Sequence, residues 1–141
     1  MQTARESSFH ESGYLNTGKR ASVLVVEDYE DNRLMMRHLL ELSGYLVFEA
    51  INGVQAINLA RLEMPDIILM DLSLPKVDGL SATRQIRSVP YLRDVPIVAV
   101  SAHDTADFHA EALAAGCNEY VTKPIDYGQL EAVIEELLMT C

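Results

Sequence analysis

The chain has 141 residues, of which 49% are hydrophobic and 23% charged, and its formal net charge at pH 7 is −10. This length and composition fit one globular domain that buries a core without disulfides or a structural metal. The longest apolar runs are only a few residues, which argues against a membrane span. Residues 21–141 hold eight basic and nineteen acidic residues, and this negative charge argues against nucleic acid as a direct partner.

Residues 1–20 contain Ser, Gly, Asn and Thr among scattered apolar residues. This pattern predicts a flexible leader, followed by one folded domain over residues 21–141. The leader has no apolar segment before a small-residue cleavage site, so we expect no secretory signal and place the protein in the cytoplasm. We expect the two cysteines, Cys117 and Cys141, to be free thiols.

From residue 23 onward, short apolar runs alternate with stretches at helical spacing. Continuous apolar runs rich in β-branched residues are typical of strands that are covered on both faces. The predicted strands are Val23–Val26, Leu46–Phe48, Ile67–Met70, Ile97–Val100 and a weaker fifth at Tyr120–Val121.

The first helical stretch carries apolar residues from Met35 to Leu42 and stops at Ser43–Gly44, and we expect Met35 and Met36 to fill the core. Further helices are predicted near residues 53–63, 80–86, 106–115 and 130–138. The connections between strands are too long for hairpins, so the strands must be parallel, with right-handed crossovers and helices on both faces. The sequence therefore predicts a doubly wound α/β domain.

In such a sheet the ligand site lies beyond the carboxyl ends of the strands. Polar residues directly follow four of the predicted strands: Glu27, Asp28, Asp71, Ser101 and Lys123. Although they are far apart in sequence, these side chains are expected to meet on one edge of the sheet. Each alone has a simpler explanation, such as a solvated loop acid, a strand-capping hydroxyl or a surface lysine.

Three carboxylates on one edge repel one another unless a cation is supplied. Mg²⁺ prefers oxygen ligands, so we expect it to be held by Glu27, Asp28 and Asp71, with the backbone carbonyl of Ser73 completing the shell. Asp71 follows a rigid strand and is a candidate nucleophile that forms an aspartyl phosphate. The Lys123 ammonium would then offset charge on the phosphate oxygens, and a cis bond to Pro124 would aim it inward.

The Ser101 hydroxyl can donate to a remaining phosphate oxygen. Two dipeptides shape the loop after Asp71, namely Leu74–Pro75 and Asp78–Gly79, and we interpret both residue types only as turn formers.

Five motifs in this order and spacing resemble the receiver domain of two-component response regulators, the CheY-like superfamily: Val25-Val-Glu-Asp28, Met70-Asp-Leu-Ser-Leu-Pro75, Asp78-Gly79, Val100-Ser-Ala102 and Tyr120-Val-Thr-Lys-Pro124. The resemblance runs from about Ala21 to the C-terminus. It implies a flavodoxin-like, five-stranded parallel sheet in the order 2-1-3-4-5.

The resemblance also implies roles for the residues at the sheet edge. Asp71 would be the phosphoacceptor, Glu27 and Asp28 the acidic pair for Mg²⁺, Ser101 the switch hydroxyl, and Lys123 the lysine that contacts the phosphate.

Three further positions match the family's pattern. Tyr120 would move inward when the switch hydroxyl swings toward the phosphate, and Ser73 and His103 stand where the family tunes phosphoryl lifetime. Phosphorylation would favour one arrangement of the surface formed by residues 104–118, Tyr120 and residues 126–139.

The expected donor is a histidine kinase or a histidine phosphotransfer protein that docks on the first helix and nearby loops. We expect no DNA-binding output domain, because the last helix ends near Met139 and the sequence stops at Cys141. A separate downstream protein would read the output.

Three other functions are conceivable for a domain of this type, and each fits the sequence less well. A small Mg²⁺-dependent phosphatase would also form an aspartyl phosphate, but such enzymes commonly carry Asp-X-Asp after the first strand. A flavin or nucleotide module would need a Gly-, Ser- or Thr-rich loop where this chain has Glu27-Asp-Tyr-Glu-Asp31. A receiver-shaped scaffold that is never phosphorylated would have no use for the acids and Lys123.

Overall fold

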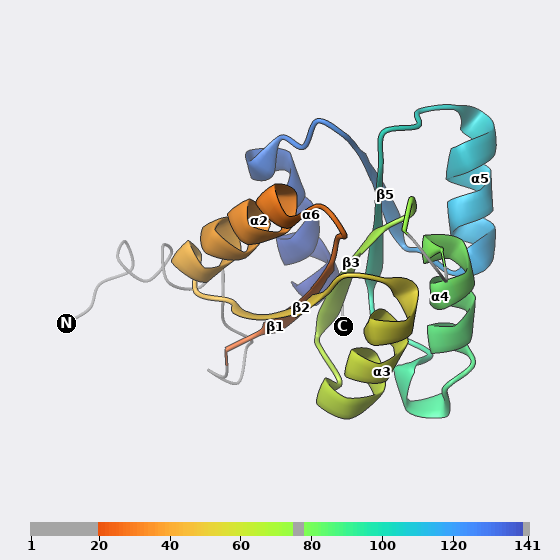
Figure 1. Ribbon diagram of the computed structural model, residues 1–141, viewed down its shortest axis with the longest axis horizontal. Coiled ribbons are helices and arrows are strands. Elements are labelled where there is room, and N and C mark those ends of the chain that lie inside the picture. The colour runs from red at the N-terminus through yellow and green to blue at the C-terminus, as the bar shows by residue number, and fades with distance from the viewer. Residues whose placement is uncertain (1–19, 75–77, 140–141) are drawn as a thin grey trace.

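The computed structural model describes residues 20–74 and 78–139. Five parallel strands form one sheet in the order β2-β1-β3-β4-β5 (Figure 1). Their bounds are β1 Ser22–Val26, β2 Leu46–Ala50, β3 Ile67–Asp71, β4 Ile97–Ser101 and β5 Glu119–Thr122. The predicted doubly wound α/β fold and its strand order are confirmed.

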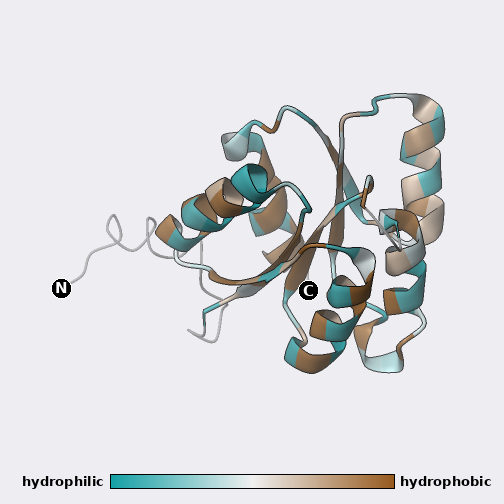
Figure 2. Cartoon of the chain, in the orientation of Figure 1, coloured by the Kyte–Doolittle hydropathy of each residue, from teal (hydrophilic) through white to brown (hydrophobic). Residues whose placement is uncertain are grey.

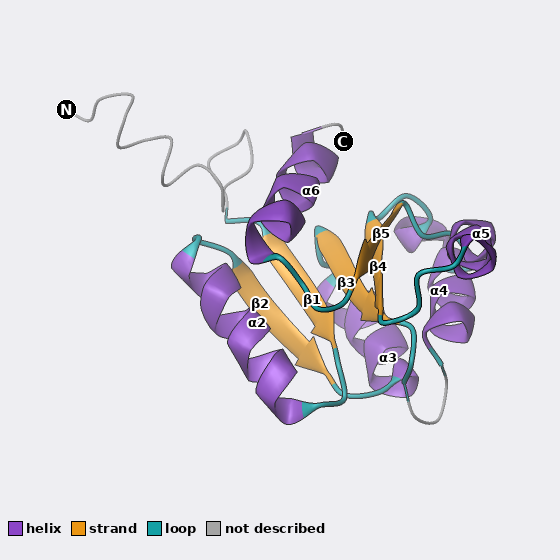
Figure 3. Ribbon diagram, turned by 90° about the horizontal axis from the view of Figure 1, so that it is seen from above, coloured by secondary structure: helices purple, strands orange, loops and turns teal. Residues whose placement is uncertain are grey.

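The helices that alternate with the strands are α2 Glu30–Leu42, α3 Gly53–Glu63, α4 Gly79–Arg87, the short 3-10 helix η1 Pro90–Leu92, α5 Ala106–Ala115 and α6 Tyr127–Met139. Figure 3 shows α2 and α6 on one side of the sheet and α3, α4 and α5 on the other. Within the described ranges, no helix combines the length and the apolar character needed to cross a bilayer.

The core consists of two layers, one on each face of the sheet. Alternate strand residues enter opposite layers: Leu24 and Ile68 pack with α3, α4 and α5, whereas Val23 and Ile67 pack with α2 and α6. Strands β1, β3 and β4 are buried at every position. Figure 2 shows the central strands as hydrophobic over most of their length, as expected for strands covered on both faces.

All five strands are one or two residues longer than the apolar runs predicted. Strand β2 continues through Glu49 and Ala50, because the parallel pairing with β1 runs to the Val26–Ala50 pair. The expectation that both methionines of α2 are buried is wrong for one of them. Met36 is 6% exposed, but Met35 is 59% exposed, because adjacent helical residues point about 100° apart.

Local chemistry fixes where the helices begin and end. Asp78 caps α4 by accepting from the Ser81 N–H at 2.8 Å, and Thr105 caps α5 by accepting from the Phe108 N–H at 3.3 Å. Gly116 ends α5 with φ of 117°, a left-handed conformation that glycine adopts without strain.

Cys117 is buried as a free thiol, and burial raises its pKa. Pro75, Cys141 and the predicted leader before Arg20 lie outside the described residues. Arg20 itself donates to the carbonyl oxygens of Gly44 at 3.1 Å and Tyr45 at 3.0 Å.

Candidate functional site

The carboxyl ends of the three central strands lie level with one another. In the register of the sheet, Val26 pairs with Met70, and Asp71 pairs with Val100. Glu27 therefore follows β1 at the height where Asp71 ends β3. Parallel pairing thus brings together residues that are more than forty positions apart in sequence.

Three carboxylates meet at this edge. Glu27, Asp28 and Asp71 each present an oxygen atom, and these atoms all lie within 4.8 Å of one another. Glu27 and Asp71 are each 3% exposed, whereas Asp28 is exposed. The predicted acidic triad is thus assembled, with two buried members and one member open to solvent.

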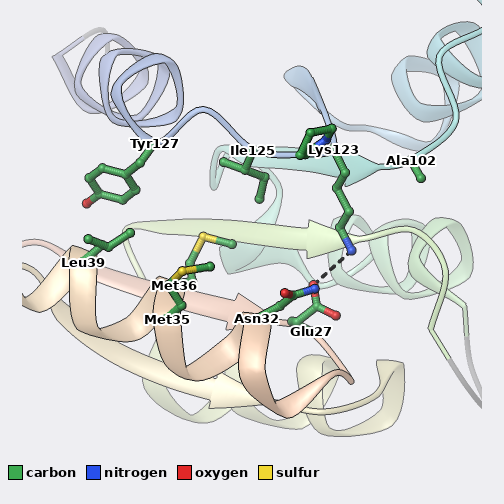
Figure 4. Close-up of a pocket in the computed structure, with 10 residues that line it drawn as sticks. Glu27, Asn32, Met35, Met36, Leu39, Ala102, Lys123, Ile125 and Tyr127 are labelled. Atoms are coloured by element: carbon green, nitrogen blue, oxygen red, sulfur yellow. Dashed lines mark hydrogen bonds and ion pairs between the residues drawn. The ribbon is translucent and has the colours of Figure 1, made fainter.

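Lys123, which follows β5, reaches the same site. Its Nζ donates to Glu27 Oε1 at 3.1 Å and to Asp71 Oδ2 at 3.3 Å. Figure 4 shows the side chain reaching from the segment after β5 toward Glu27. The Lys123–Pro124 peptide bond is cis, as the sequence suggested.

The electrostatics of the site point to excess negative charge. Burial raises the pKa of Glu27, the neighbouring Asp71 carboxylate raises it further, and donation from the Tyr29 N–H and from Lys123 opposes the rise only in part. Burial alone would lower the pKa of Lys123, but the carboxylates of Asp71 and Glu27 outweigh it and the pKa rises. One ammonium therefore does not neutralise three carboxylates, and a second cation would be stabilised here.

Backbone donors orient the two buried carboxylates. The Ser73 N–H donates to Asp71 Oδ1 at 2.9 Å, and the Tyr29 N–H donates to Glu27 Oε2 at 3.1 Å. Ser73 is exposed and contacts the cluster through its N–H, so the expectation that its carbonyl oxygen binds Mg²⁺ stays a prediction. Each buried carboxylate thus has one oxygen held by the backbone and one held by Lys123.

Gly79 matters more than its interpretation as a turn former suggested. A Cβ at this position would collide with the carbonyl oxygen of Asp71 and would lie 2.6 Å from the Cα of Leu72. The first turn of α4 therefore packs directly on the backbone that carries Asp71. The Asp78-Gly79 dipeptide after β3 was the available sequence signal, but only the tertiary contact reveals the need for glycine.

Residues 23–135 match the family model of the response regulator receiver domain. The chain belongs to this family. Receiver domains are phosphoacceptor switches of two-component signalling.

Relatives and solved structures agree with this assignment. The chain is 38% identical over 117 residues to the polar-differentiation response regulator DivK of Brucella anthropi, covering 83% of this chain and 95% of that protein. DivK of Brucella ovis gives the same identity and coverage.

Among solved structures, the receiver domain of the sensor histidine kinase PA1611 from Pseudomonas aeruginosa superposes with a TM-score of 0.79 at 35% identity, over 84% of this chain and 98% of that chain. That crystal structure has a magnesium ion coordinated in its active site cleft. The chemotaxis protein CheY4 of Vibrio cholerae gives a TM-score of 0.80 at 26% identity, covering 83% of this chain and 98% of that chain.

In this receiver domain the Ser101 hydroxyl is engaged by the loop that follows it. Ser101 is 1% exposed, and its Oγ accepts from the His103 N–H at 3.1 Å and lies 3.3 Å from His103 Nδ1. The Tyr120 hydroxyl donates to the His103 carbonyl oxygen at 2.7 Å. His103 therefore joins the two predicted switch residues, a link that the sequence did not reveal.

An apolar groove of about 520 Å³ adjoins the carboxylate cluster of the receiver. The α2 side is formed by Met35, Met36 and Leu39, and the opposite side by Ile125 and Tyr127 before and at the start of α6 (Figure 4). Glu27 and Lys123 also line the groove. The carboxylate site is thus continuous with an apolar groove, and the exposed Met35 forms part of its wall.

Proposed function

We propose that this receiver domain is a phosphorylation switch that accepts a phosphoryl group on Asp71 from the phosphohistidine of a histidine kinase or a histidine phosphotransfer protein. The observation that carries the proposal is the position of Lys123, whose ammonium bonds to both Glu27 and Asp71 within a cluster of three carboxylates. An ammonium at this place is suited to hold a phosphate oxygen beside the acceptor.

The donor set fits a hard divalent cation. If all three acids are ionised, three carboxylates face one ammonium, so the cluster has net negative charge and offers only oxygen ligands, as Mg²⁺ prefers. Glu27, Asp28 and Asp71 would hold the ion, together with the backbone carbonyl of Ser73. When bound, Mg²⁺ would supply positive charge against the phosphate oxygens.

The residues of the chain perform the transfer itself. A carboxylate oxygen of Asp71 attacks phosphorus, the phosphorus–nitrogen bond of the donor breaks, and its electron pair returns to the imidazole nitrogen. Lys123 moves from carboxylate to phosphate oxygen and offsets its charge. Ser101 donates its hydroxyl hydrogen to another phosphate oxygen once it leaves His103.

Two surfaces serve the partners in this proposal. The donor would dock on the groove beside α2, which is lined in part by Glu27 and by Lys123, the residue whose ammonium bonds to Asp71. A downstream protein would read the surface of residues 104–118, Tyr120 and residues 126–139. Residues 21–141 would act as the receiver in the cytoplasm, preceded by the leader over residues 1–20 and without direct contact to nucleic acid.

Labelling by a small acyl phosphate tests the proposal. We expect one phosphoryl group per chain when Mg²⁺ is present and no labelling when the reaction contains excess EDTA. Hydroxylamine, which cleaves acyl phosphates, should release the label. Steady hydrolysis of p-nitrophenyl phosphate, faster than the loss of the protein's own label, would instead support a phosphatase. Absence of any label with Mg²⁺ would support an unphosphorylated scaffold.

A further inference from the structure

The three carboxylates of the cluster are not held equally. Glu27 and Asp71 are buried, and each accepts hydrogen bonds from a backbone N–H and from Lys123. Asp28 is exposed, and in the part of the chain that the structure describes its carboxylate has no hydrogen-bond partner. The position of this carboxylate therefore depends on the backbone that carries it.

Arg33 of α2 holds the peptide unit that leads into Asp28. Its Nη1 donates to the carbonyl oxygen of Glu27 at 3.2 Å, and this carbonyl belongs to the same planar unit as the Asp28 N–H. Arg33 lies near the start of the helix, where side chains tilt back toward the N-terminus, so its guanidinium returns to the end of β1. The Glu27 N–H donates to the Ala50 carbonyl oxygen of β2 at 3.0 Å. The backbone of Glu27 is thus held on both sides, on one of them by Arg33.

A carboxylate on the neighbouring strand orients this guanidinium. Glu49 belongs to β2, beside which α2 runs (Figure 3). Arg33 Nε donates to Glu49 Oε1 at 2.9 Å, and the other oxygen of Glu49 accepts from Arg37 Nη1. The side chains of Arg33 and Glu49 are only 13% and 19% exposed. Because a guanidinium is a rigid plane, the bond of Nε to Glu49 aims Nη1 at the Glu27 carbonyl.

We propose that Arg33, oriented by Glu49, is a positioning residue that fixes the peptide unit between Glu27 and Asp28 and thereby the solvent-exposed carboxylate of the Mg²⁺ site. The consequence for Mg²⁺ rests on the proposed function, whereas the effect on the peptide unit does not. Neither the family match nor the motifs of the sequence assign a role to Arg33. The site would thus extend from the edge of the sheet to the side of α2 that faces β2.

The charge of Arg33 and its positioning effect act in opposite directions on Mg²⁺ binding. Removing a positive charge close to three carboxylates would by itself favour a divalent cation. Releasing Asp28 would weaken binding, because a ligand that must be ordered on binding costs conformational entropy. Weaker binding after loss of Arg33 therefore identifies positioning as the cause.

Arg33→Met and Arg37→Met are a matched pair of variants. Each removes one arginine from α2 and one ion pair to Glu49, and each leaves an unbranched apolar side chain that suits a helix. Of the two arginines, Arg33 alone donates to the Glu27 carbonyl. Weaker Mg²⁺ binding in the first variant and not in the second therefore reports on that hydrogen bond.

The first test measures the order parameter of the Asp28 amide by NMR relaxation, without Mg²⁺. We expect a value of about 0.85, typical of rigid backbone, in the wild type and in Arg37→Met, and a fall toward about 0.6 in Arg33→Met. The amide spectrum shows at the same time whether each variant is folded. An unchanged order parameter in folded Arg33→Met would overturn the inference.

The second test measures the Mg²⁺ affinity of the unphosphorylated protein by NMR titration with magnesium chloride. Arg33→Met should bind Mg²⁺ about tenfold more weakly than the wild type, the lower end of the effect typical of residues that orient metal ligands. Arg37→Met should bind at least as tightly as the wild type. Equal or tighter binding by Arg33→Met would show that Arg33 acts only through its charge, and the inference would fail.

Arg33→Lys covers the case in which Arg33→Met does not fold. Lysine keeps the positive charge but offers a single nitrogen, which pairs with the Glu49 carboxylate and leaves the Glu27 carbonyl without its donor. The Asp28 order parameter and the Mg²⁺ affinity should then both fall although the charge is unchanged. Wild-type values of both quantities in Arg33→Lys would also overturn the inference.

The outcomes separate the two proposals. If the wild type binds Mg²⁺ and Arg33→Met loses neither rigidity nor affinity, the role of Arg33 is overturned and the proposed function stands. If no protein binds Mg²⁺, the wild type included, the Mg²⁺ site of the proposed function fails. The order parameter of Asp28 then still decides whether Arg33 holds the peptide unit.

Discussion

The ammonium of Lys123 lies 3.3 Å from Oδ2 of Asp71, although 52 positions separate the two residues in sequence. The same nitrogen lies 3.1 Å from Oε1 of Glu27. The buried carboxylate that we propose as the phosphoryl acceptor thus already has a cation beside it. This arrangement costs little to reorganise, because the ammonium needs only to move from one oxygen to another.

Lys123→Gln should slow labelling by a small acyl phosphate about 10- to 100-fold, since a charge-assisted hydrogen bond of about 1.5–3 kcal/mol is lost where charge develops. The measurement is the initial rate of phosphoprotein formation with saturating Mg²⁺. Arg84→Gln removes a cation from the exposed surface of α4 and should leave the rate unchanged. An unaltered rate in Lys123→Gln would contradict the role of the ammonium.

Gly79→Ala should destabilise the domain by roughly 1–3 kcal/mol, because the added methyl group meets the backbone of Asp71 and Leu72. Urea denaturation measures the change. Gly128→Ala in α6 is a matched control, since its Cβ would make only an ordinary contact at 3.4 Å with Asp126. This control should be as stable as the wild type or more stable, because alanine favours helix. Equal stability of all three proteins would argue against close packing at Gly79.

Glu49 should make stability depend on pH. Burial tends to raise its pKa, but hydrogen bonds from Arg37 and Arg33 outweigh burial and lower it. A lowered pKa in the folded state gives stability that is present above the unfolded value of about 4.3 and is lost as pH falls through the folded pKa.

Glu49→Gln should therefore lower the free energy of unfolding by about 1–2 kcal/mol at neutral pH, and the difference should shrink toward zero in acid. Urea denaturation of both proteins at neutral pH and at acidic pH measures this difference in the free energy of unfolding. Glu63→Gln, at the exposed end of α3, serves as the control. A difference that is the same at both pH values would show that charge on Glu49 is not the cause.

The groove beside α2 should matter for a protein donor and not for a small one. Met35 is 59% exposed and lines the groove, so Met35→Glu should slow transfer from a purified phosphorylated histidine phosphotransfer domain by about tenfold, as expected for an interface contact of 1–2 kcal/mol. Labelling by a small acyl phosphate should stay unchanged. Leu62→Glu, at a 73% exposed position of α3, is the matched control for adding charge to an exposed apolar residue. Equal transfer rates for both variants would contradict docking on the groove.

Much of the fold could be predicted because its main signals are local. Runs such as Ile67–Met70 are continuous because the strand is covered on both faces, and parallel strands bring their carboxyl ends to one edge. Glu27, Asp71 and Lys123 could therefore be placed together from sequence order alone.

What could not be predicted depends on contacts between distant side chains. The exposure of Met35 beside the buried Met36 follows from the rotation of α2 against the sheet. The need for glycine at position 79 arises from the path of α4 over Asp71. The stacking of His109 on Tyr120 joins two elements whose sequences contain no shared pattern.

Intact mass spectrometry after incubation with Mg²⁺ and a small acyl phosphate tests most directly whether Asp71 is the acceptor. The wild type should gain the mass of one phosphoryl group, and Asp71→Asn, which keeps the size and shape of the side chain, should gain none. Equal labelling of the two proteins would place the acceptor elsewhere and contradict the account.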